Sequence, residues 1–104
     1  MYKHIDPTQL QALLAADDPP LVIDVRSVAE VARGTITGAR HLDLATLPSR
    51  VDELDAAAPT VVFCLSGGRS AQACNWLAQR GFSNLYNLDG GIAAWTRAGM
   101  PVTA

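Results

Sequence analysis

The segment TVVFCLSGGRS (60–70) places three residue types that could do chemistry within a few positions of one another. Cys64 ends an apolar run, Gly67 and Gly68 follow it, and Arg69 stands five positions after the cysteine. A cysteine is a nucleophile only as the thiolate, and an ordinary thiol is mostly protonated at neutral pH. The chemistry of this segment therefore depends on whether its other residues favour the ionised form of Cys64.

Three features of the loop favour the thiolate. Gly67 and Gly68 tolerate the positive φ values with which backbone N–H groups can turn inward toward an anion. A helix expected to start near Ser70 directs the positive end of its dipole at the loop. Arg69 adds a charge that deprotonation cannot remove. We predict an anion-binding cradle around Cys64 that is built from Leu65, Ser66, Gly67, Gly68 and Arg69, with the Ser66 hydroxyl offered to the sulfur.

The alternative interpretation is that Cys64 is a buried packing residue, since cysteine is among the most buried residue types. A plain strand-to-helix turn needs neither two glycines nor an arginine at this spacing, so we favour the reactive interpretation. Loop length then limits the reaction. A cysteine phosphatase needs Arg six positions after Cys, whereas the sixth position here is Ser70. The shorter loop fits a smaller anionic guest, such as one extra sulfur on Cys64.

The surrounding pattern predicts strands that alternate with helices. LVIDV (21–25), TVVFC (60–64) and NLYNL (84–88) are expected strands. Two helices are expected to begin at caps, one after Asp6 and one at the capping box of Ser27 and Glu30. Three more helices are expected over 48–54, over 70–80 and over the stretch IAAWTRA, which Gly99 closes. This alternation indicates an α/β fold with a parallel sheet and helices on both faces. Ligands of such sheets gather where strands end, which is the place of Cys64.

Length and composition indicate one domain, residues 1–104, with 49% apolar and 17% charged residues. A net charge of −2 with dispersed basic residues argues against a nucleic-acid partner. No segment is apolar enough for a signal peptide or a membrane span. Two cysteines without a signal peptide are expected to be thiols of a reducing compartment. We therefore expect a cytoplasmic monomer that does not bind membranes.

Two long segments resemble the rhodanese family of sulfurtransferases. VIDVRSVAEVARGTITGARHL is similar to the family's D-V-R-x-x-x-E and G-x-I-x-G-A elements. VVFCLSGGRSAQACNWLAQRGFSNLYNLDGGIAAWTRAGMPV resembles the family's active loop, its helix, the next strand and the closing G-G-x-x-x-W element. The resemblance covers nearly the whole chain. It implies a rhodanese-like three-layer fold, in which helices flank a parallel five-stranded sheet on both faces.

The resemblance also implies the reaction. Cys64 would take a sulfane sulfur from thiosulfate or a persulfide, hold it as a persulfide, and pass it to cyanide or a thiol. It implies no cofactor and no metal. A non-catalytic carrier that relays persulfide between sulfur-carrier proteins would use the same loop and stays open as the alternative. A phosphatase or arsenate reductase on the same fold is disfavoured by the short loop.

Two positions depart from the family pattern. Thr35 stands where many members have His, and Leu65 where many have a second basic residue. An apolar Leu65 leaves the mouth of the loop less positive, which favours a persulfide donor over doubly charged thiosulfate.

Four further residues receive structural expectations. Arg26 is expected to pair with Glu30 four positions later, and Asp24 to accept hydrogen bonds from loop amides. Cys74 is expected to be a buried packing residue of the helix that follows the loop, although it could also serve as a resolving thiol.

Overall fold

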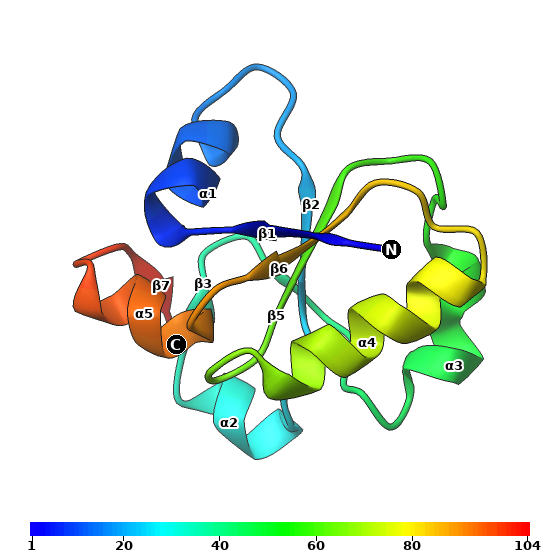
Figure 1. Ribbon diagram of the computed structural model, residues 1–104. Coiled ribbons are helices and arrows are strands. Elements are labelled where there is room, and N and C mark those ends of the chain that lie inside the picture. The colour runs from blue at the N-terminus through cyan, green and yellow to red at the C-terminus, as the bar shows by residue number, and fades with distance from the viewer.

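A computed structural model describes residues 1–104, and its main sheet is parallel throughout (Figure 1). The strands lie in the order β1-β6-β5-β2-β4, so that β5 is central. Their bounds are β1 (Lys3–Ile5), β2 (Leu21–Asp24), β4 (Arg40–His41), β5 (Thr60–Phe63) and β6 (Leu85–Leu88). Five parallel strands with helices on both faces confirm the predicted fold class.

The helices form two layers, with α1 and α5 on one face of the sheet and α3 and α4 on the other (Figure 1). Their bounds are α1 (Pro7–Leu14), α2 (Val28–Ala32), α3 (Leu47–Arg50), α4 (Gly68–Gln79) and α5 (Gly91–Arg97). The expected helix over 48–54 is α3 followed by a short 3₁₀ helix, η1 (Val51–Glu53). No helix of the chain is both long enough and apolar enough to cross a membrane.

The central strand divides the apolar core between the two faces. Val61 and Phe63 point toward the core under α1 and α5, whereas Val62 and Cys64 belong to the core under α3 and α4. Successive side chains of a strand point to opposite faces, which explains this division. All four residues are at most 1% exposed. The burial of β5 on both faces holds the start of the loop in a fixed position.

Local sequence signals set the helix starts as expected. The side chain of Asp6 accepts a hydrogen bond from the backbone amide of Gln9 over 2.8 Å, and the side chain of Gln9 accepts one from the backbone amide of Asp6 over 2.9 Å. Ser27 and Glu30 form the second capping box, at the start of α2. Each box satisfies backbone N–H groups that a helix end would otherwise leave unpaired.

One small sheet was not foreseen from the sequence. β3 (Thr35–Ile36) pairs antiparallel with β7 (Val102–Thr103). This pairing brings the end of the chain beside the segment that follows α2, on the side of the molecule that carries α5 (Figure 1).

Candidate active site

Cys64 follows directly after β5, at the edge of the sheet where the parallel strands end. Leu65, Ser66 and Gly67 then turn the chain into α4, whose first residue is Gly68. Gly67 caps the helix with a φ of +117°, a conformation that residues with a side chain rarely adopt. The predicted loop therefore exists, and the positive φ falls on one of its two glycines.

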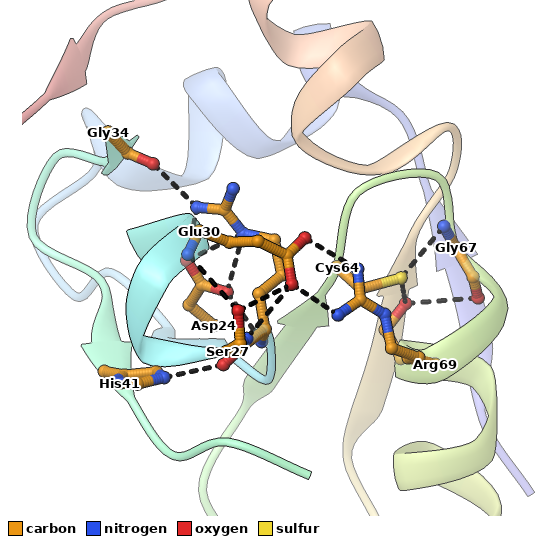
Figure 2. A network of polar contacts seen from close by, with 10 residues as sticks. Asp24, Ser27, Glu30, Gly34, His41, Cys64, Gly67 and Arg69 are labelled. Carbon is orange, nitrogen blue, oxygen red and sulfur yellow. Dashed lines mark hydrogen bonds and ion pairs between the residues drawn. The ribbon is translucent and has the colours of Figure 1, made fainter. Parts of the chain in front are cut away.

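The sulfur of Cys64 points into this turn (Figure 2). The amide of Gly67 donates to Sγ over 3.1 Å, and Oγ of Ser70 lies 3.4 Å from Sγ. Ser66, which was expected to supply the hydroxyl, is instead exposed in the turn. That expectation is wrong because Ser70, in the first turn of α4, is the serine whose side chain faces inward.

Asn87 of β6 holds the polar side of the turn in place. Oγ of Ser70 donates to Oδ1 of Asn87 over 2.5 Å, and Nδ2 of Asn87 donates to the carbonyl of Gly67 over 3.2 Å. The carbonyl of Gly67 can only accept, so it fixes which end of the Asn87 amide faces Ser70. Neither Ser70 nor Asn87 was given a role from the sequence. The signal that could have found Asn87 is an amide inside an otherwise apolar strand.

The environment of the sulfur acts on its ionisation in two opposing ways. Cys64 is 1% exposed, and this burial raises the pKa of its thiol. Hydrogen bonds from the Ser70 hydroxyl and from the amides of Ser70, Gly67 and Ser66 lower it by more, so the net pKa lies below the ordinary value. Hydrogen bonds to the charged form stabilise a thiolate in this way. Of the predicted amides, those of Gly67 and Ser66 bond to the sulfur, and the amide of Ser70, outside the predicted set, joins them.

Arg69 does not contact the sulfur directly. Its guanidinium donates to both carboxylate oxygens of Glu30, over 2.7 and 2.9 Å (Figure 2). The hydrogen bonds from Arg69 hold the pKa of Glu30 at about 2, against burial, which acts in the opposite direction. The expectation that Arg69 gives the loop a full positive charge is corrected by this pairing. Glu30 neutralises the charge and ties the loop to α2.

Arg26 pairs with Asp24 and not, as expected, with Glu30. Its Nε and Nη2 donate to the carboxylate of Asp24 over 3.0 and 2.8 Å, and Nη2 also donates to the carbonyl of Gly34 over 2.7 Å. Asp24 further accepts the Arg26 amide and, over 2.7 Å, the hydroxyl of Thr35. Both ions of the pair are almost fully buried. Asp24 and Arg26 thus fasten the chain around α2, and Asp24 accepts a loop amide as expected, that of Arg26 in the loop between β2 and α2.

The first turn of α5 supports the loop from the other side. The amides of Ile92 and Ala93 donate to the carbonyls of Cys64 and Leu65 over 2.9 and 3.1 Å. A Cβ on Gly91 would lie 2.4 Å from each of these two carbonyl oxygens. Gly91 therefore permits a close approach that turns the first two loop carbonyls toward α5 and away from the sulfur.

The second cysteine lies outside this cradle. Cys74 is fully buried on α4, and burial raises the pKa of its thiol to about 12. Its expected placement in the core is confirmed. Nε2 of His41 donates to the carbonyl of Arg26 over 2.7 Å, and no three His, Cys, Asp or Glu side chains come together as a metal site.

Comparison with known proteins agrees with this geometry. The family model described as "Rhodanese-like domain" matches residues 6–98. A protein named sulfurtransferase from Allochromatium vinosum is 40% identical over 104 residues, which cover 100% of this chain and 97% of the relative. The thiosulfate sulfurtransferase GlpE of Pseudomonas entomophila is 40% identical over 94 residues, which cover 90% of this chain and 84% of the relative.

Solved structures show the same arrangement of elements. A rhodanese-related protein from Thermoplasma volcanium superposes with a TM-score of 0.89 at 30% identity, over 98% of both chains. The rhodanese-like domain of an Anabaena protein gives a TM-score of 0.90 at 27% identity, over 100% of this chain and 80% of the other. The chain belongs to the family of rhodanese-like domains. The prediction of a sulfurtransferase of the rhodanese type is confirmed at the level of the family.

Proposed function

We propose that the protein transfers sulfane sulfur through a persulfide on Cys64. The observation that carries this proposal is the Cys64 sulfur, which accepts the Gly67 amide and contacts the Ser70 hydroxyl at the start of α4, in a chain of the rhodanese-like family. A buried thiol without such partners would be inert, because burial alone disfavours the thiolate. No cofactor is required by the reaction.

The transfer proceeds in two displacements. The thiolate of Cys64 attacks the outer sulfur of the donor, forms an S–S bond, and releases sulfite from thiosulfate or a thiolate from a persulfide. An acceptor thiolate or cyanide then attacks the outer sulfur of the Cys64 persulfide, and the Cys64 thiolate leaves. Each step exchanges one bond to sulfur for another, so no oxidant is needed. Splitting the reaction in this way predicts ping-pong kinetics.

The loop supports a persulfide donor better than thiosulfate. Leu65, beside the cysteine, is 49% exposed and carries no charge. Glu30 neutralises the one arginine of the loop. Within the loop itself, the two charges of thiosulfate would therefore meet little net positive charge, whereas the sulfur of a persulfide brings less negative charge into the loop. We expect a higher kcat/KM for a glutathione persulfide than for thiosulfate, and the reverse preference would reject this choice of donor.

The test is whole-protein mass spectrometry after incubation with thiosulfate or a persulfide. We expect a gain of one sulfur, lost in Cys64→Ser and retained in Cys74→Ser, because the thiol of Cys74 has a pKa of about 12 and stays protonated. A gain that survives Cys64→Ser would refute the assignment. Turnover with cyanide or a thiol supports an enzyme, and loading without turnover supports a carrier between proteins.

The state of the cysteines bears on the compartment. Cys64 and Cys74 are both free thiols. We place the reaction in the cytoplasm, because a reducing compartment keeps Cys64 available between turnovers.

A further inference from the structure

A groove of about 510 Å³ opens beside the cysteine loop. It lies between the end of α2, α5 and β7, and Leu65 of the loop forms part of its wall. Figure 1 shows α2 and α5 on either side of the loop that joins β5 to α4. Because ligand pockets commonly enclose on the order of several hundred cubic ångströms, the groove is large enough for a molecule of tripeptide size.

The charge of the groove is positive, although the chain as a whole carries −2. Arg26, Arg33 and Arg97 line it, and none of its lining residues is acidic. Arg26 is neutralised by Asp24. None of the five ion pairs of the structure involves Arg33 or Arg97, and both are exposed. Two free guanidinium groups thus stand at one groove, one at the end of α2 and one at the end of α5.

Backbone hydrogen bonds also connect the groove to the loop that holds the reacting sulfur. Ile92 and Ala93, which line the groove, are the residues whose amides hold the carbonyls of Cys64 and Leu65. Cys64 is 1% exposed, so only the reacting end of a donor can enter the loop, and the rest of the molecule must stay outside. The exposed side of Leu65 leads from the loop to the groove.

We propose that this groove binds the body of a small organic thiol that carries carboxylates, both as its persulfide and as the free thiol. Arg33 and Arg97 bind the carboxylates, because a guanidinium matches a carboxylate in charge and in hydrogen-bond geometry. Leu65, Ile92 and Val102 contact the carbon chain. The proposal deepens the proposed function and, for the transfer itself, rests on it. In that step the Cys64 thiolate bonds the outer sulfur of R–S–SH, and R–S⁻ leaves within the groove.

Binding is tested without chemistry by titrating the protein with S-methylglutathione, which has two carboxylates and cannot accept sulfur. We expect amide shifts in nuclear magnetic resonance spectra at residues 33–34, 92–97 and 102. We expect Arg33→Gln and Arg97→Gln each to weaken binding about threefold, as for one exposed ion pair. Lys3→Gln is the matched control, since it removes the same charge from β1. No shifts at these residues, or equal weakening by all three variants, would overturn the proposal.

Transfer is tested by comparing two persulfide donors, one from glutathione and one from cysteamine, which has no carboxylate. We expect Arg33→Gln and Arg97→Gln to lower kcat/KM about threefold for the glutathione persulfide and to leave it unchanged or raised for the cysteamine persulfide. Equal losses for both donors would overturn the groove while leaving the proposed function standing. Absence of any sulfur gain on Cys64 would overturn the proposed function, and the S-methylglutathione titration would still decide the groove.

Discussion

Replacing Ser70 by Ala tests which hydroxyl group stabilises the thiolate of Cys64. The Ser70 hydroxyl lies 3.4 Å from Sγ, and it is the largest of the influences that lower the pKa of this thiol against burial. We expect Ser70→Ala to raise the pKa of Cys64 and to reduce the thiolate present at neutral pH. Ser66→Ala is the matched control, because it removes a hydroxyl from the same loop that is exposed to solvent.

The size of the effect follows from the contact. A hydrogen bond to a charged group contributes about 1.5–3 kcal/mol. The lower end applies here, because the distance is long and because the Ser70 hydroxyl has a single proton, for which Asn87 and the Gly67 carbonyl compete with the sulfur. About 1.4 kcal/mol corresponds to a factor of ten. We therefore expect Cys64 to react about ten times more slowly at pH 7 in the variant.

The assay is the rate at which iodoacetamide alkylates Cys64, followed by mass spectrometry from neutral to alkaline pH in a Cys74→Ser background. The loss in Ser70→Ala should shrink as pH rises, because the thiolate then forms without the hydroxyl. Ser70→Thr, which keeps the hydroxyl, should recover much of the rate. Unfolding is measured in parallel, since Oδ1 of Asn87 loses its donor. An unpaired buried acceptor of this kind costs about 1–3 kcal/mol.

Two results would refute the reasoning. If Ser66→Ala slowed the reaction as much as Ser70→Ala, the sequence-based assignment of the hydroxyl would be right after all. If Ser70→Ala lost the same factor at every pH, the hydroxyl would affect access to the sulfur and not its ionisation.

Three further predictions concern the residues that hold the loop. Glu30→Gln should release Arg69 and lower KM for thiosulfate about threefold, as for one exposed ion pair; an unchanged KM would show that Arg69 stays out of reach of the donor. Because the pKa of Glu30 is held at about 2, its carboxylate stabilises the fold above its ordinary pKa of 4.5, and this stabilisation is lost as pH falls from 4.5 toward 2. The melting temperature of Glu30→Gln should therefore fall less steeply over that range than that of the parent protein. A Cβ on Gly91 would meet two carbonyl oxygens at 2.4 Å, in addition to the strain of a φ of +59°. Gly91→Ala should therefore lower the free energy of unfolding by about 3 kcal/mol or more. Gly99, with a φ of +77°, has no atom within 4 Å of such a Cβ. Gly99→Ala should cost only about 2 kcal/mol or less in urea unfolding, and equal losses at both sites would contradict the role given to the Gly91 contact.

The local features of the fold could be predicted from the sequence alone. The capping boxes of Asp6 with Gln9 and of Ser27 with Glu30 join residues three positions apart, so their signals are contained in one turn of chain. The turn after Cys64 is similarly local, because its shape depends on Gly67 and on the helix that follows. These features need no knowledge of which segments lie side by side.

The prediction that Arg26 pairs with Glu30 was wrong for a geometric reason. The rule that residues four apart meet holds within a helix. Arg26 stands before the cap residue Ser27, in the extended chain that leaves β2, so it is not on α2. Residues two apart in extended chain lie on the same side, which places Arg26 beside Asp24.

Only the tertiary structure decided what surrounds the sulfur beyond its own loop. Asn87 reaches Ser70 because β6 pairs with β5, and this strand order cannot be read from the sequence. Glu30 meets Arg69 because α2 and the loop lie at the same edge of the sheet. The sequence determined that a thiol would sit in a turn of inward amides, since the turn is local. The packing of distant segments determined which hydroxyl supports the thiolate and how the charge of the arginine is used.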